Sequence, residues 1–573
     1  MRFWLMLLLF IPLTLLSNEG MKYLKFVTHG PIKAKELYRA SNIELPAWYE
    51  FWKKKEPKVS PLIINSLQET LANYYRSEGF YHAKITKKED NTTVIFITEA
   101  GEPVYVKEIA VEGDIDFGRF VTFKKGERFS ARKFVEIKKN IKRFLLEKGF
   151  CNAILDAKAW VDIVKNSVKL RFFVQKNRPC HIGKISIHTP PNIDEKVVRS
   201  RLTFESGDLY NLKKLNRSYS TISGLEAFDA IKIDQNKHDH TIDLDIQLEK
   251  KHKPIRESIG IGYETNYGPR GLLHWEQRNF KGGAKKLSFD AKYSKKEKFL
   301  QNNFFVPAFI KLPYLKNRYL DFKNEFSYSE MIYENFDERS IRDLVHLLKD
   351  FDTFSIDMGI GIERIEITKT ADVCNVIDGD FKLLFPFAKL IIDHRDSKVD
   401  PRRGYYLSLY LEGGMKQILS SASYAKLFQE VRGIYTLGDT TLALKAKLGL
   451  INELESRIPE SKLFFAGGAY SNRGFGFNRL GASDAFCEGV GGRTMIDTSV
   501  ELVHPLFHKF SGALFLDSTM ISSNSFTFSG KFRHSAGIGL HYDTPVGPIK
   551  LDIGFNLEES DQYAIHFLIG QSF

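Results

Sequence analysis

The chain has 573 residues, roughly three to four times the size of a typical domain, so we expect several domains. Hydrophobic residues make up 43% and charged residues 27%, which excludes a helical membrane bundle and a wholly disordered chain. Residues 255–573 hold 39 basic and 39 acidic side chains, so residues 1–254 carry the whole net charge of +13. This uneven distribution argues against a uniformly basic nucleic-acid binder and predicts two parts with different roles.

The first seventeen residues predict a secretory signal peptide. Arg2 supplies a short positive region, residues 3–16 form an apolar core, and Ser17 suits cleavage. Leu15 departs from the usual small residue before the cut, so the cleavage site stays open by a few positions. An N-terminal anchor helix is the alternative. No later window approaches ~18 consecutive apolar residues, so we expect no transmembrane helix in the mature chain.

Three copies of one small pattern follow the leader. Residues 74–85, 144–155 and 222–233 align with one another on a shared phenylalanine. Each copy is preceded by an apolar helical pattern that begins after a capping residue. The aligned phenylalanines are Phe80, Phe150 and Phe228; the caps are Ser60, Ser130 and Asn211; and the first helix is expected to bury Ile63, Leu67, Leu71 and Tyr74.

Each copy ends in a strand with period-two alternation, clearest from Thr241 to Glu249. The element order and the repeated glycine-to-phenylalanine corner resemble the POTRA module. We therefore predict three α+β units at 18–102, 103–178 and 179–253, with three unrelated α+β domains as the alternative. A module of this shape exposes a sheet edge, to which an extended client chain can add as a strand.

The remaining residues, 254–573, predict a transmembrane antiparallel β-barrel of about 16 strands. Strands of ~10 residues recur with no intervening helix, and large apolar residues alternate with small or charged ones. The clearest strands, at 535–542, 549–557 and 563–570, lie near the end of the chain. Behind a secretory signal we interpret the apolar face as lipid-facing, because closure satisfies every backbone group. A soluble all-β assembly is the alternative.

The segment FFAGGAYSNRGFGF at 464–477 carries the sharpest motif. It resembles the conserved extracellular loop of the BamA/TamA superfamily of outer-membrane assembly factors. Segments 393–404, 491–502, 513–518 and 535–555 match further parts of the family pattern in the same order. The positions that carry the loop resemblance are Phe465, Gly467, Gly468, Ser471, Arg473, Gly474 and Phe475.

With three POTRA-like units rather than five, the chain resembles TamA more than BamA. The resemblance implies an outer-membrane protein whose POTRA-like units lie in the periplasm. It implies an insertase for unfolded β-barrel or autotransporter clients in the lipid bilayer, and a TamB-like inner-membrane-anchored partner. The alternative is an export pore for one dedicated protein, as in two-partner secretion, and a passive porin ranks third.

We predict that the loop folds into the barrel and is held there by Arg473. In the strand pattern Glu501 and Asp517 both belong to the lumen-facing set. Arginine suits this role because its planar fork binds a carboxylate bidentately. The family pattern implies Asp517 as its partner, with Glu501 as second candidate, and Gly474 and Phe475 as the residues that bend and pack the loop. Thr519 departs from the family glycine, and a solvated loop charge is the alternative.

Barrel closure requires the first strand, near 257–264, to pair with the last, 563–573. Gly260 and Gly262 lie in the first, and Gly570 and Phe573 lie in the last. Glycine weakens a strand, so we predict a weak seam, which in the family opens sideways for clients. The alternative is that these glycines only relieve crowding in the lumen.

No motif for catalysis or for a cofactor is present, so we expect neither an enzyme nor a metal site. The sequence holds no His-Glu-x-x-His and no Gly-x-Ser-x-Gly pattern, and no Cys-x-x-Cys pair. Two disulfides are conceivable in an oxidising compartment, Cys151 with Cys180 and Cys374 with Cys487, and the sequence leaves both open. The basic N-terminal part suggests contact with anionic headgroups or an acidic partner, and nucleic acid is not expected.

Overall fold

A computed structural model describes residues 21–46, 56–264, 268–313, 319–351, 353–370, 376–398, 400–482, 490–544, 547–559 and 561–569. The predicted signal peptide, Gly570, Phe573, Cys374 and Cys487 lie outside these residues. The chain forms two compact units, one of residues 1–185, 204–216 and 235–244, the other of 186–203, 217–234 and 245–573. The boundary between the units runs through the third POTRA-like module.

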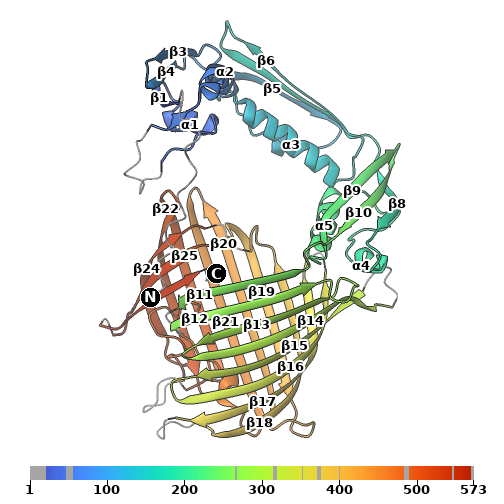
Figure 1. The fold of residues 1–573 in the computed structure, drawn as a ribbon, viewed down its shortest axis with the longest axis vertical. Helices are drawn as coiled ribbons and strands as arrows, with labels where there is room; N and C mark the ends of the chain where they lie inside the picture. Colours follow the sequence, from blue (N-terminus) through green and yellow to red (C-terminus); the bar gives the residue numbers. More distant parts are fainter. Residues whose placement is uncertain are drawn as a thin grey trace, which may run out of the picture. The chain divides into compact units, whose positions relative to one another are not determined.

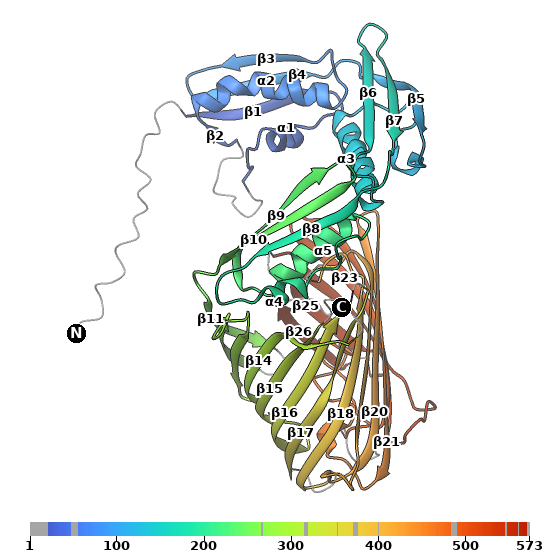
Figure 2. The same ribbon diagram turned by 90° about the vertical axis from the view of Figure 1, so that its right-hand side faces the viewer.

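The first module packs two helices against a four-stranded sheet of order β2-β1-β4-β3 (Figure 2). Both helices and the two central strands bury side chains in one core. Its elements are β1 (Lys22–His29), α1 (Ala34–Ala40), β2 (Lys58–Val59), α2 (Pro61–Ser77), β3 (Lys84–Glu89) and β4 (Thr93–Glu99).

Helix α2 begins where the sequence predicts, with Ser60 at its N-cap and proline at its first turn. The predicted Leu67 and Leu71 are buried, and the buried face differs from the predicted one only at its two ends. Ile64 and Tyr75 are buried, whereas Ile63, which we expected inside, is 40% exposed. The hydroxyl of Tyr75 donates a hydrogen bond of 2.7 Å to Thr98 of the sheet, which explains why this tyrosine is the buried one.

The second and third modules repeat the α/β order, each with a three-stranded sheet, β5-β7-β6 and β8-β10-β9. In the second module a 3₁₀ turn replaces the first helix. The predicted class of α/β units is confirmed. The elements are β5 (Tyr105–Gly113), η1 (Gly118–Phe120), α3 (Ala131–Glu147), β6 (Ile154–Asp162), β7 (Ser167–Gln175), β8 (His181–His188), α4 (Glu195–Arg199), α5 (Leu212–Ser223), β9 (Phe228–His238) and β10 (Thr241–Lys250).

A disulfide joins Cys151 and Cys180, with a Cα–Cα distance of 5.8 Å. The bond links the turn that follows α3 to the residue that precedes β8. Cys180 is fully buried, and its backbone N–H donates to the carbonyl of Gly149 at 2.8 Å. The bond therefore fastens the second module to the start of the third.

Replacing Cys151 and Cys180 by serine should destabilise this junction by about 3.5 kcal/mol, because the bond closes a loop of about thirty residues. The check is proteolysis of the full-length protein in detergent along a urea gradient. We expect cleavage of residues 103–253 at lower urea than in the unmodified protein without reductant, and reductant should remove this difference. A variant with Cys374 and Cys487 replaced by serine is the control. An unchanged urea midpoint would contradict the expectation.

The third module is fastened to the strands that follow it within the second compact unit. Arg201 makes two hydrogen bonds of 2.8 Å to the carboxylate of Asp321 at the start of β15. Asp229 accepts hydrogen bonds from the backbone and the ring of His252, in the segment that leads to β11. These bonds lower the pKa of Asp229 to about 2, so the carboxylate is charged at neutral pH.

The second half forms one antiparallel sheet of 16 strands in sequence order, as predicted (Figure 1). The first and last strands contact each other, as a barrel requires. The strands are β11 (Ile255–Glu264), β12 (Gly268–Arg278), β13 (Lys286–Ser294), β14 (Glu297–Lys311), β15 (Tyr319–Ile332), β16 (Phe336–Asp350), β17 (Ser355–Lys369), β18 (Gly379–Asp393), β19 (Arg403–Gly414), β20 (Ser423–Leu437), β21 (Thr440–Glu455), β22 (Thr494–Phe507), β23 (Phe510–Ser522), β24 (Arg533–Tyr542), β25 (Ile549–Asn556) and β26 (Tyr563–Ile569).

Apolar side chains dominate the outward face of the sheet, and the inward face carries mostly polar or small residues along β22 to β25 but apolar ones such as Ile365 and Leu383 along β17 and β18. Along β22, Val500 and Leu502 are 40% and 45% exposed, whereas Ser499 and Glu501 are 2% and 1% exposed. The neighbouring strands continue this pattern, because directly opposed residues share a face. Among the described helices, none has the length and the hydropathy that crossing a bilayer requires. The outward apolar face is the one that lipid would contact.

Candidate functional site

The loop that joins β21 to β22, residues 456–493, carries the motif that the sequence analysis singled out. We call residues 456–482, its described first part, the lumen loop. The short 3₁₀ turn η2 (Glu460–Lys462) opens it. Arg473 lies near its far end with only 1% of its surface exposed. An arginine buried to this degree must be paired, because desolvating an unpaired guanidinium is costly.

Arg473 binds Asp517 of β23 with both its guanidinium and its backbone. Its Nε and Nη2 atoms donate to the two carboxylate oxygens at 2.9 Å each, and its backbone N–H donates to Oδ2 at 2.9 Å. Ser499 supports the pair, since its hydroxyl donates to Asp517 at 2.6 Å. Asp517 thus holds both the side chain and the backbone of the loop, which fixes position and orientation together.

Two further carboxylates and one ring surround the same guanidinium. Nη1 donates to Glu501 of β22 and lies 3.4 Å from Asp552 of β25. The ring of Phe515 lies 3.5 Å from the guanidinium carbon, in the geometry of a cation–π contact. Arg473 therefore joins three strands of the inner wall. We call Arg473, Asp517, Glu501 and Asp552 the latch.

Three acids and one arginine would leave an excess of buried negative charge; Lys550 supplies a second cation, and His541 adds a hydrogen-bonding ring. Lys550 lies 3.4 Å from Glu501, and the Nε2 of His541 lies 3.0 Å from Asp552. Both are almost fully buried. The latch is therefore the centre of a larger network that extends down β24 and β25, and removing any one member leaves others unpaired.

The backbone next to Arg473 lies directly on the wall. A side chain at Gly474 would meet the Cβ of Ser535 at 2.4 Å, and one at Gly554 would meet the carbonyl oxygen of Arg473 at 2.2 Å. The Nε2 of His566 lies 2.9 Å from that oxygen. Gly474 has no left-handed backbone angle. It lies in the turn that the N–H of Phe475 closes on the carbonyl of Asn472 at 3.3 Å, so this glycine combines the predicted bend with close approach to the wall.

Two other glycines of the motif make the turn at 467–468. Gly467 and Gly468 have φ values of 96° and 98°, a region that residues with side chains rarely adopt. The N–H of Gly468 donates to the carbonyl of Phe475 at 3.0 Å, which brings the two arms of the turn together. Phe475 is half-buried and lines a pocket at the inner wall. Ser471 caps the turn, its N–H donating to the carbonyl of Gly468 at 3.1 Å.

Two lysines of β21 bind the middle of the lumen loop. Lys445 and Lys447 donate to the carbonyl of Tyr470 at 3.2 Å and 2.7 Å. Lys447 also pairs with Asp497 at 3.3 Å, and Thr519 donates to the same Asp497 at 2.7 Å. Thr519, where the family has glycine, thus adds a hydrogen bond beside the latch.

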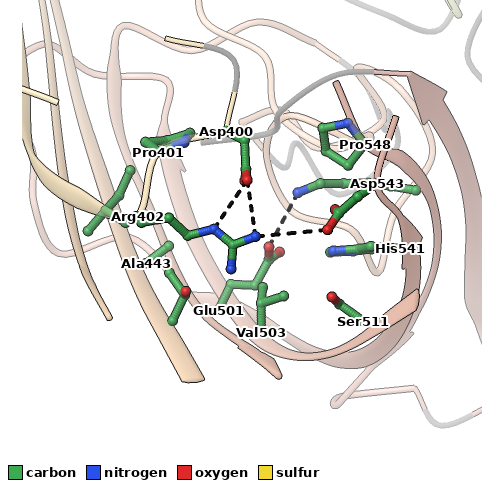
Figure 3. Close-up of a pocket in the computed structure, with 13 residues that line it drawn as sticks. Asp400, Pro401, Arg402, Ala443, Glu501, Val503, Ser511, His541, Asp543 and Pro548 are labelled. Atoms are coloured by element: carbon green, nitrogen blue, oxygen red, sulfur yellow. Dashed lines mark hydrogen bonds and ion pairs between the residues drawn. The ribbon is translucent and has the colours of Figure 1, made fainter. Parts of the chain in front are cut away.

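The periplasmic side of the network borders a pocket of about 40 Å³ (Figure 3). This volume holds only a few water molecules. Glu501 and Lys550 line it, and Arg402 enters it from the turn between β18 and β19. Arg402 binds Asp400 at 3.0 Å and lies 3.9 Å from Asp543 of another periplasmic turn. The segment 393–404 of the sequence motif therefore borders the same pocket as the latch residue Glu501.

The predicted seam residues are described only in part. Gly260 and Gly262 lie in β11, opposite Leu272 and Arg270 of β12. A side chain at Gly260 would make only ordinary contact with Leu272, so packing does not demand glycine there. The last described residues of β26 end at Ile569, one residue before the predicted Gly570.

A model of the family described as the Omp85 superfamily domain matches residues 279–573. The chain belongs to this superfamily. It is 20% identical over 519 residues to the outer membrane protein assembly factor BamA of Nitratidesulfovibrio vulgaris, covering 86% of the chain and 65% of the relative. It is 23% identical over 352 residues to BamA of Buchnera aphidicola, covering 58% of the chain and 55% of the relative.

The chain thus spans two-thirds or less of the length of these relatives. The crystal structure of BamA from Haemophilus ducreyi lacking POTRA domains 1–3 matches with a TM-score of 0.55 at 15% identity. The match covers 82% of this chain and 99% of that one, and it supports the fold of POTRA-like units followed by the sixteen-stranded sheet. The superfamily predicted from the loop motif is confirmed, and a closer kinship with TamA stays a prediction.

Proposed function

We propose that the protein is an outer-membrane insertase that assembles unfolded β-barrel or autotransporter clients through the seam between β11 and β26. The observation that carries this proposal is the fastening of the lumen loop. Arg473 is buried against three strands near one side of the seam, and His566 of β26 contacts its backbone. A loop fixed this firmly can keep the end of the sheet in shape while the seam opens.

The filling of the lumen favours an insertase over a passive pore. An apolar cluster lies where the lumen loop meets the wall, on the side of the sheet opposite to lipid. Packed side chains leave no water path through such a cluster. Its members include Phe336, Ile365, Leu383, Phe385, Tyr424, Ile451, Ile458, Leu463, Phe464 and Met495.

An open seam would offer the backbone groups that a client strand needs. The free edge of β11 or β26 presents N–H and C=O groups that pair with any extended chain. The outward side chains Ile259 and Ile261 of β11 are 80% and 93% exposed, so lipid already reaches this edge. The POTRA-like units would hand the unfolded client to the seam from the periplasm, and a TamB-like protein anchored in the inner membrane is the expected partner.

Reconstitution separates the candidate functions. We expect the purified protein in liposomes to raise the rate at which a urea-unfolded client barrel becomes heat-modifiable by at least roughly tenfold over empty liposomes. We also expect little steady conductance in planar bilayers. A large steady conductance without client insertion would indicate a porin. Passage of one dedicated protein into the liposome lumen would indicate an export pore, and either result would overturn the proposal.

A further inference from the structure

A second buried cation of the lumen loop lies well before the latch in sequence. Lys462 ends the turn η2, and 12% of its side chain is exposed. Its ammonium group lies 2.7 Å from Glu363 of β17 and 3.5 Å from Glu412 of β19. It also lies 4.4 Å from the centre of the Phe385 ring of β18, in cation–π geometry.

The surroundings of Lys462 are built to hold this group. Tyr410 and Tyr424 donate to the two oxygens of Glu412 at 2.5 Å and 2.9 Å, so that carboxylate is also held by groups other than the lysine. Lys426 of β20 donates to the carbonyl of Lys462 at 2.7 Å. Both the side chain and the backbone of this loop residue are therefore bound, as they are at Arg473.

The contacts of the loop follow the order of the strands. Lys462 contacts β17 to β20, the carbonyl of Tyr470 contacts β21, and Arg473 contacts β22, β23 and β25. The two buried cations are eleven residues apart in sequence and share no partner among the described contacts. Lys462 and Arg473 therefore bind different strands of the wall, and the two lysines of β21 bind the part of the loop between them.

We propose that Lys462 is a second anchor of the lumen loop, independent of the latch, which holds the base of the loop while Arg473 holds its tip. Releasing the latch then frees the tip but leaves the apolar residues beside Lys462 in the wall. This proposal describes how the loop of the proposed insertase is held in place. Only its consequence for client insertion depends on the proposed function. The position of the loop can be measured without any client.

The test measures the accessibility of Leu463, which is buried next to Lys462. Leu463→Cys is placed in a background with Cys374 and Cys487 replaced by serine, and maleimide labelling is followed in outer-membrane vesicles. We expect Lys462→Met to raise the labelling rate by roughly tenfold or more, because the local opening that exposes this position becomes easier. Lys462→Arg should restore slow labelling. Arg473→Ala should leave labelling at Leu463→Cys slow.

The matched control is Lys298→Met in β14, where an exposed lysine lies 2.6 Å from Glu330 on strands outside the described contacts of Lys462 and Arg473. It should not change the labelling. Since Lys462→Met leaves two acids without their cation, the pair Lys462→Met with Glu363→Gln provides a folded alternative, checked by heat-modifiable mobility. Slow labelling in both Lys462→Met and Lys462→Met with Glu363→Gln would overturn the second anchor. So would fast labelling in the single variant Arg473→Ala. Client insertion is assayed separately, so failure of the proposed function would appear there and not in the labelling.

Discussion

Arg473→Ala is expected to cost the barrel about 3–5 kcal/mol, because it leaves Asp517, Glu501 and Asp552 buried without their shared cation. The loss should appear as a lower urea midpoint for the heat-modifiable, folded form in detergent. Client insertion should fall with it, because the tip of the lumen loop no longer holds the wall near β26. The urea midpoint of Arg473→Lys should lie between those of Arg473→Ala and the unmodified protein, since one ammonium group cannot bind both carboxylate oxygens of Asp517 as the guanidinium does.

Arg479→Ala is the matched control for this prediction. Arg479 belongs to the same loop, but it is largely exposed and pairs with Glu334 at 3.4 Å on the surface. Removing a surface pair should cost less than about 1 kcal/mol. The double variant Arg473→Ala with Asp517→Asn should lose less than the sum of the two single losses, because the partners act as a unit. Additive losses, or an unchanged midpoint in Arg473→Ala, would exclude the latch.

The two-residue period of the strands was enough to predict which side chains face the lumen. Glu501 could be assigned to the inner wall because it lies between the apolar Val500 and Leu502. Asp517 could be assigned there because it alternates with the apolar Leu514 and Leu516, and the structure brings both carboxylates to Arg473. Asp552 and His541 also lie on the inner faces of their strands. The sequence gives no measure of how far around the sheet a loop can reach, so their place in the network could not be predicted.

The errors of sequence reasoning have local physical causes. The apolar pattern of α2 correctly places Leu67 and Leu71 inside but offers two adjacent apolar residues at each end, and at the second end the hydrogen bond to Thr98 holds Tyr75 inside. A glycine motif predicts a turn, but the close approach of Gly474 to Ser535 depends on how the loop meets the wall and could not be predicted from the sequence. Lys462 was missed because a lone lysine before an apolar motif resembles any solvated loop charge, and its two carboxylates lie about 50 and 100 residues earlier in the chain.

The second large effect concerns the seam, and a reversible covalent bond tests it directly. Cysteines are placed on the lipid-facing side of both strands, at Ile259 or Ile261 of β11 and at Tyr563 or Ile565 of β26, with Cys374 and Cys487 replaced by serine. Opposed residues of neighbouring strands lie ~4.5–5.5 Å apart, which suits a disulfide. Because β11 and β26 contact each other, at least one pair of this small grid should oxidise.

We expect the oxidised pair to lower client insertion by at least roughly tenfold, because a closed seam offers no free strand edge, and reductant should restore it. The control is Leu273→Cys with Ala291→Cys, which joins the directly opposed strands β12 and β13 away from the seam. Oxidation of this control pair should leave client insertion unchanged. Because the control receives the same reductant, it also reports any effect of reducing the disulfide between Cys151 and Cys180. If the seam-bonded protein inserts clients as fast as the control, the sheet need not open between its first and last strands. Clients would then have to enter the membrane along its outer wall.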